Sequence, residues 1–127
     1  MTLAYWCILL AALMPLAFAG IAKLGHPGFT NRRPRDFLDE LDGYRRRAHW
    51  TQLNSYEAFP PFAAAVIIAH ATGGNQMWID ALALAFIVVR VSYGWLYLAD
   101  RPTARSLAWL LGLACTVGLF IVAAAGA

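Results

Sequence analysis

The chain has 127 residues, of which 61% are apolar and only 13% charged, and its ten Lys and Arg residues against seven Asp and Glu residues give a net charge of +3. A soluble domain of this size carries about a quarter charged residues, so the composition excludes most soluble folds, disordered chains and secreted disulfide scaffolds. The basic excess is gathered in one connecting segment, so it predicts an orientation in a membrane and not a nucleic-acid partner.

Four apolar segments predict an all-α integral membrane bundle that occupies residues 1–127 as a single domain. About 20 apolar residues in a helix suffice to cross a hydrocarbon core roughly 30 Å thick. The expected membrane helices are residues 3–22, 49–71, 76–98 and 104–126. Residues 23–48 are expected to form a long basic loop, in which the acidic residues 36–42 lie in a solvated turn or short helix and the arginines 45–47 partly anchor the chain to the membrane surface.

The first apolar segment ends in Ala17-Phe18-Ala19, which resembles a signal-peptidase site. A signal peptide carries its positive charge before the apolar region, whereas here Lys23 follows it. We therefore interpret residues 3–22 as a retained membrane helix. Cys7 and Cys115 lie inside apolar segments, and we interpret both as small hydrophobic residues, with neither a disulfide nor a metal site.

The basic residues also predict which way the bundle faces. Nine of the ten Lys and Arg residues lie in the loop 23–48 or follow residue 99. By the positive-inside rule, the loops 23–48 and 99–104 are expected in the cytoplasm, with both termini on the periplasmic or lumenal side. The five tryptophans then fall near the two membrane interfaces, as an aromatic belt requires. We expect the location to be a bacterial inner membrane.

The polar side chains that are costly within the predicted spans are Asn54 and Glu57 in the second and Arg90 in the third. A charge at the bilayer centre costs about 3 kcal/mol, so such residues usually face the bundle interior and have a partner. Glu57 and Arg90 each lie about 12 Å from the cytoplasmic end of their span, so antiparallel helices bring them level. We expect them to be partners in one cavity open to the cytoplasm. The alternative is that these groups only fix the packing of the helices.

Helical spacing extends both polar faces. The residues that share one face of the second span are Arg47, Asn54, Glu57 and Pro61, and those on the third are Arg90, Tyr93, Tyr97 and Arg101. Pro60 and Pro61 lack N–H donors, so two carbonyls one turn earlier are expected to lose their usual helical partners.

The run from Arg45 to Phe62, RRRAHWTQLNSYEAFPPF, resembles the second-helix signature of the MAPEG family, the membrane-associated proteins in eicosanoid and glutathione metabolism. The family pattern is an arginine, then Asn-x-x-Glu, a proline and a phenylalanine. The four helices, the long basic first loop and the tyrosine-rich end of the third helix match as well. The resemblance implies a homotrimer of four-helix subunits that binds glutathione between neighbouring protomers and acts on lipophilic electrophiles.

The same resemblance implies roles for individual residues. Asn54 and Glu57 would hold the backbone and the amino group of glutathione. Arg90, Tyr93 and Tyr97 would line the same pocket from the adjacent helix.

Two positions depart from the family pattern. Trp50 stands where the eukaryotic pattern has an arginine, and Arg47, on the same helix face, would replace it. The thiolate-stabilising arginine of the family would be either Arg101 or Arg105, and the sequence leaves this choice open.

Three functions therefore compete. The first is a membrane-bound, glutathione S-transferase-like enzyme, a transferase or peroxidase that uses glutathione as co-substrate, an arginine-stabilised thiolate and no metal. The second keeps the fold but drops catalysis, giving a membrane binding or accessory subunit. The third is a small multidrug exporter, whose essential glutamate belongs to the first helix, which here carries no charge before Lys23.

Overall fold

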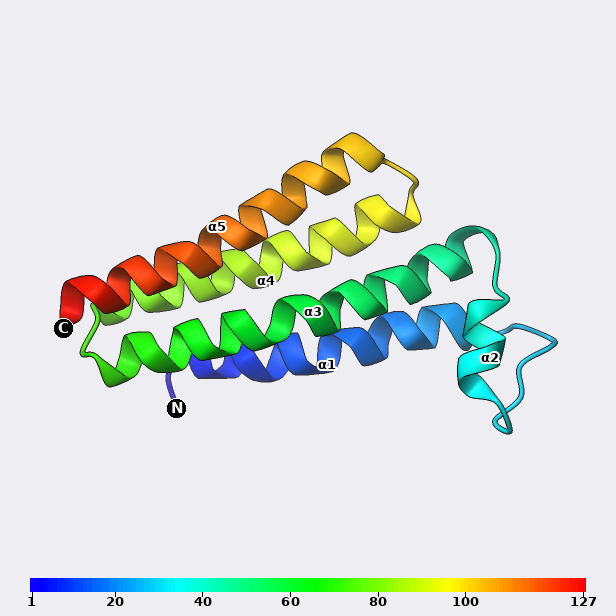
Figure 1. Cartoon of the computed structure of the whole chain (residues 1–127), viewed down its shortest axis with the longest axis horizontal. Helices are drawn as coiled ribbons and strands as arrows, with labels where there is room; N and C mark the ends of the chain where they lie inside the picture. Colours follow the sequence, from blue (N-terminus) through cyan, green and yellow to red (C-terminus); the bar gives the residue numbers. More distant parts are fainter.

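The computed structural model describes all 127 residues and contains helices but no strands. Its long helices are α1 (Leu3–Lys23), α3 (Gly43–Ala71), α4 (Gln76–Leu98) and α5 (Pro102–Gly126), and the short α2 (Pro34–Asp39) lies in the first loop. Figure 1 shows both termini and the α3–α4 turn at one end of the bundle, which we call the termini end. The other end, with α2 and the α4–α5 turn, is the loop end. The predicted all-α bundle is confirmed.

The long helices pack around a central pair. α3 and α4 contact each other, α1 packs against both of them, and α5 packs against both on the opposite side. The rings of Phe62 and Phe86 stack in the core with centroids 3.8 Å apart. Toward the loop end, the α4–α5 hairpin diverges from the α1–α3 hairpin (Figure 1).

Three of the helices, α1, α4 and α5, are long and apolar enough to cross a membrane. Large apolar side chains face outward along them, for example Leu10, Leu111 and Ile121, which are all more than half exposed. Burying such side chains in lipid removes the cost of exposing them to water, so these surfaces are suited to acyl chains. The chain is an integral membrane protein.

The second long helix begins at Gly43, six residues before the predicted start at residue 49. The apolar pattern could not reveal this extension, because residues 43–48 are mostly polar and continue the helix beyond the apolar segment. Pro60 and Pro61 lie inside the helix and do not end it. The acidic part of the loop includes a short helix, one of the two expected forms.

The run Arg45-Arg46-Arg47 connects the loop ends of three helices. Each guanidinium donates to backbone carbonyls at the C-terminal end of a different helix. The acceptors are the carbonyls of Ala22 and Leu24 for Arg45, of Asp39 for Arg46 and of Leu98 for Arg47. The last carbonyls of a helix lack intrahelical partners and carry partial negative charge. A guanidinium donates the missing hydrogen bonds and also supplies a compensating positive charge. These arginines therefore cap helices, a role that their position in the sequence did not reveal.

At the termini end, Asp80 of α4 caps the first turn of α1. Its Oδ1 accepts a hydrogen bond of 2.9 Å from the backbone N–H of Ala4. His70 of α3 lies 3.0 Å from the Thr2 hydroxyl and stacks on the ring of Tyr5. The start of α1 is therefore held by side chains of two other helices, none of which the sequence analysis had singled out.

Glycines allow the closest contacts at the same end. A Cβ atom added to Gly126 would lie 2.6 Å from the backbone nitrogen of Gly74, so the last turn of α5 rests directly on the α3–α4 turn. Gly73 in that turn has φ of +74°, a conformation that glycine adopts without strain.

Gly94, near the loop end of α4, allows another close contact and gives the sharpest test of the helix packing. A Cβ atom there would overlap the ring of Phe18 on α1, so we expect Gly94→Ala to lower the free energy of unfolding by about 1–3 kcal/mol. Gly20→Ala is the control, because the nearest atom to its added Cβ is 3.9 Å away. Denaturation in detergent micelles measures both. The double variant Gly94→Ala/Phe18→Leu should recover part of the loss, and equal stabilities of Gly94→Ala and Gly20→Ala would contradict the packing.

Candidate functional site

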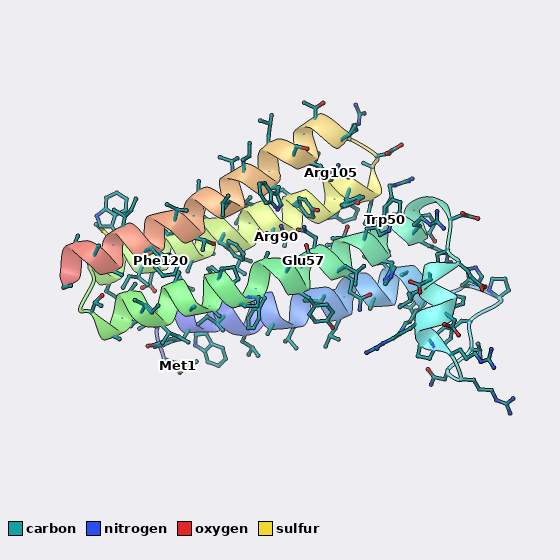
Figure 2. All side chains as sticks on the ribbon, viewed as in Figure 1. Met1, Trp50, Glu57, Arg90, Arg105 and Phe120 are labelled. Atoms are coloured by element: carbon teal, nitrogen blue, oxygen red, sulfur yellow. The ribbon has the colours of Figure 1, made fainter.

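The polar residues of the spans meet in the loop-end half of the bundle. Arg90 of α4 is buried, with 3% of its surface exposed, and its Nη2 donates a 2.9 Å hydrogen bond to Oδ1 of Asn54 on α3. Asn54 in turn donates from Nδ2 to Oε2 of Glu57, at 3.3 Å. Figure 2 shows Glu57 and Arg90 at the same level of the bundle, with Arg105 and Trp50 nearer the loop end.

Glu57 and Arg90 lie level, as their positions along the helices predicted, but they do not form a direct ion pair. The one contact within 4.0 Å between a basic nitrogen and a carboxylate oxygen joins His49 Nε2 to Asp39 Oδ1, at 3.7 Å. Asn54 stands between the two charges because it faces Arg90, while Glu57, three residues later, is an exposed side chain. The two side chains line one cavity, as expected, but their contact is relayed by the amide of Asn54.

Aromatic rings continue the site toward the loop end. The guanidinium carbon of Arg90 lies 4.2 Å from the ring centre of Tyr93, and that of Arg105 lies 4.3 Å from the ring centre of Tyr97. The two tyrosines meet edge to face, with centroids 5.7 Å apart. Two cations thus bracket two aromatic rings in an arrangement that cation–π attraction stabilises.

The hydroxyl of Tyr93 is free to meet a ligand. Tyr93 is 4% exposed and its hydroxyl has no hydrogen-bond partner in the chain, yet no enclosed side-chain nitrogen or oxygen lacks a partner. Its hydroxyl therefore borders open space. Tyr93 is a lining residue of two of the hollows that surround the site.

Three hollows adjoin one another here. The Arg105 hollow, of about 230 Å³, is lined by Tyr93, Tyr97, Arg105, Ser106 and Trp109. The Trp50 hollow, of about 370 Å³, is lined by Trp50, Leu53, Asn54, Glu57, Tyr93 and Tyr97. The α3–α5 cavity, of about 170 Å³, is lined mainly by residues of those two helices, with Phe86 and Arg90 of α4 completing its wall. It shares Asn54 and Glu57 with the Trp50 hollow.

The structure thus brings together six of the eight predicted site residues, namely Asn54, Glu57, Arg90, Tyr93, Tyr97 and Arg105. The other two lie apart from the hollows. Arg101 is exposed at the start of α5, and Arg47 uses its guanidinium on the carbonyl of Leu98.

Comparison with known protein families shows to which family the chain belongs. The MAPEG family model matches residues 3–125, nearly the whole chain. The chain belongs to the MAPEG family. Comparison with curated proteins gives no significant match. The family consists of membrane helical bundles with glutathione-related transferase and peroxidase chemistry, so the resemblance seen in the sequence is confirmed at that level.

In this MAPEG protein, the last helix contributes more to the site than the sequence analysis predicted. Trp109, Gly112, Leu113 and Thr116 of α5 line the α3–α5 cavity. With Arg105 they follow a helical spacing of three and four residues, so they share one face. That spacing was visible in the sequence, but apolar residues on a membrane helix give no sign of which face meets a site.

The end of α4 fixes the distance between its tyrosines and Arg105. Asp100 has φ of +58°, its N–H donates to the carbonyl of Tyr97, and the N–H of Arg101 donates to that of Leu96. These two hydrogen bonds form a Schellman motif, which leaves the Leu98 carbonyl unpaired within the helix. Arg47 supplies the missing donor. Arg47 thus stabilises the turn that leads into α5, on whose first turn Arg105 lies.

Asn54 is expected to hold the site together. Asn54→Leu removes the hydrogen-bond acceptor of the buried Arg90 guanidinium, so we expect a loss of about 2 kcal/mol in the free energy of unfolding. Arg90→Met in the same chain removes the group left without its acceptor. The double variant should therefore lose less than the sum of the single variants in micellar denaturation. Additive losses would show that the two side chains are not coupled.

Proposed function

We propose that this MAPEG protein is a membrane-bound glutathione-dependent transferase or peroxidase that acts on lipophilic electrophiles. The observation that carries the proposal is the pairing of two guanidiniums with two tyrosines beside a carboxylate, all bordering hollows in a lipid-embedded bundle. Intramembrane ionisable groups usually mark a functional site.

The side chains match the groups of glutathione, which has an ammonium, two carboxylates and a thiol. The carboxylate of Glu57 is exposed and accepts one hydrogen bond, from Asn54, so it can also accept from the ammonium. The tyrosine hydroxyls and the N–H groups of Arg90 not used by Asn54 suit a carboxylate, because charge-assisted hydrogen bonds are the stronger ones. Glutathione is thus proposed as the co-substrate.

Arg105 is the proposed thiolate-stabilising residue. A free thiol has a pKa of about 8.5, and a nearby guanidinium lowers it. Arg105 lies in the first turn of α5, where the helix dipole adds positive potential, and it lines a hollow shared with both tyrosines. Arg101 lines no hollow described above. In the transferase reaction the thiolate sulfur forms a bond to the electrophilic carbon, and the leaving group departs with its electron pair.

The orientation and the assembly belong to the same proposal. We propose that the protein lies in a bacterial inner membrane with its loop end facing the cytoplasm and its termini facing the periplasm, an orientation that the positive-inside rule favours. α3 lies along α1 and would be the fourth crossing helix. Glu57 is exposed on the outside of the bundle, and a charge there is costly in lipid. We propose that neighbouring subunits of a homotrimer cover it.

Arg105 and Arg101 are predicted to differ in the thiolate that they support. Protein purified in detergent should bind glutathione and show thiolate absorbance at neutral pH. Arg105→Gln should lower this absorbance and kcat about tenfold or more, since one unit of thiol pKa is a factor of ten in thiolate. Arg101→Gln, the matched control, should change neither. The reverse pattern would assign the role to Arg101.

Binding without thiolate would instead favour the accessory subunit, which one observation supports. Trp50 occupies the position of a family arginine, and Arg47 is committed to the Leu98 carbonyl. Glu57→Gln tests the position of the site itself, because it should abolish glutathione binding under either reading. Unchanged binding would remove Glu57 from the site.

The homotrimer is tested by crosslinking in native membranes. We expect the crosslinked species to saturate at three chains, because the family resemblance implies a homotrimer of four-helix subunits. Analytical ultracentrifugation in density-matched detergent gives an independent mass. Saturation at two chains would contradict the trimer.

A further inference from the structure

The α3–α5 cavity differs in chemistry from the two hollows beside it. Its walls are mainly carbon, from Pro61 on α3, Phe86 on α4, and Trp109 and Leu113 on α5. Thr116 at its inner end donates its hydroxyl to the Gly112 carbonyl at 3.4 Å, so that group is already occupied. The polar side chains of the cavity are otherwise Asn54, Glu57 and Arg90, gathered at one wall.

The size of the cavity limits what it can hold. A volume of about 170 Å³ is close to that of an apolar protein cavity of about 150 Å³ that stays dry and binds benzene. The cavity therefore fits one aromatic ring or an apolar group of similar bulk. Glutathione as a whole is too long and too polar for this volume, and only the wall formed by Asn54, Glu57 and Arg90 belongs to its proposed site.

Its position connects lipid with the proposed thiolate. Trp109 and Leu113 are 42% and 45% exposed, so two residues of the cavity wall also belong to the outer surface of the bundle. Trp109 also lines the Arg105 hollow. A molecule that enters from the acyl chains would thus contact Trp109, which separates it from the Arg105 hollow.

We propose that the α3–α5 cavity is the acceptor site and takes a small, uncharged, single-ring electrophile. This rests on the proposed function, in which glutathione occupies the neighbouring hollows. With chlorodinitrobenzene as acceptor, the thiolate sulfur bonds to the ring carbon that carries chlorine. The carbon–chlorine bond then breaks, chloride leaves with the electron pair, and the thiol proton has already passed to water.

Gly112 determines how much room the ring has. A Cβ atom added there would lie 3.5 Å from Cδ of Arg90 and farther from its other neighbours, which is ordinary contact. Gly112→Ala therefore fits without strain and favours the helix, since alanine has a higher helix propensity than glycine. Its methyl group takes space from the cavity. Loss of ligand in this variant cannot be attributed to unfolding.

The first experiment measures binding without glutathione, so it does not depend on the proposed chemistry. Dinitrobenzene, which lacks the leaving group, should raise the Tm of the wild-type protein in nanodiscs, and the rise should be smaller in Gly112→Ala. Gly20→Ala, far from the cavity on α1, should behave as wild type. No rise in the wild type would mean that an acyl chain or a second copy fills the cavity, and would overturn the assignment, as would equal rises in all three proteins.

The second experiment measures conjugation of chlorodinitrobenzene to glutathione. Gly112→Ala should lower kcat/KM for the acceptor about tenfold or more, because one methyl group in an apolar pocket changes discrimination by about that factor. Its KM for glutathione should not change. Leu113→Ala should enlarge the site and improve the use of the fused-ring chlorodinitronaphthalene, whereas Leu110→Ala, exposed on the same helix, should not. An unchanged acceptor preference in both cavity variants would overturn the proposal.

The two experiments separate the two claims. Ring binding that Gly112→Ala weakens, in a protein that conjugates nothing, would support the cavity as a ligand site and reject the transferase. Conjugation that is indifferent to Gly112 and Leu113 would support the transferase and reject this acceptor site.

Discussion

A buried guanidinium must be hydrogen-bonded, and this requirement at Arg90 organises the functional half of the bundle. Burying a charge without partners is costly, and more so at membrane depth. Asn54 meets part of the requirement, and the ring of Tyr93 lies 4.2 Å from the guanidinium carbon. Since these partners come from α3 and α4, the central helix pair is set in register by the same contacts that build the candidate site. In this protein, the polar groups that fix the packing of α3 against α4 are therefore the same groups that form the candidate site.

Much of this was predictable, because membrane proteins obey simple rules. Apolar length and charge distribution gave the helices, and depth arithmetic placed Glu57 and Arg90 at one level. The relay through Asn54 was not predictable, since a difference of three residues on a helix decides which side chain faces inward. The role of α5 escaped for another reason. Its lining residues are apolar or small, and such residues look the same whether they face lipid, a neighbouring helix or a cavity.

The arginine run shows a second limit of sequence reasoning. A basic cluster beside a membrane helix is typical of contact with lipid headgroups, and nothing in the letters distinguishes that from capping. In the structure, Arg45 to Arg47 satisfy carbonyls at the ends of α1, α2 and α4. The three arginines are adjacent in the sequence, but the helix ends that they contact are far apart in the sequence. Only in the folded bundle does it become clear which carbonyls at the helix ends lie within reach of these arginines.

The direct backbone contact between Gly126 and Gly74 has a mechanical consequence. With no side chains between them, the last turn of α5 and the α3–α4 turn lie in direct contact. At the loop end, by contrast, the α4–α5 hairpin diverges from the α1–α3 hairpin (Figure 1). α5 has 25 residues and is therefore about 38 Å long. A tilt of only a few degrees at this contact would therefore shift the opposite end of α5, and Arg105 with it, over a distance of ångströms.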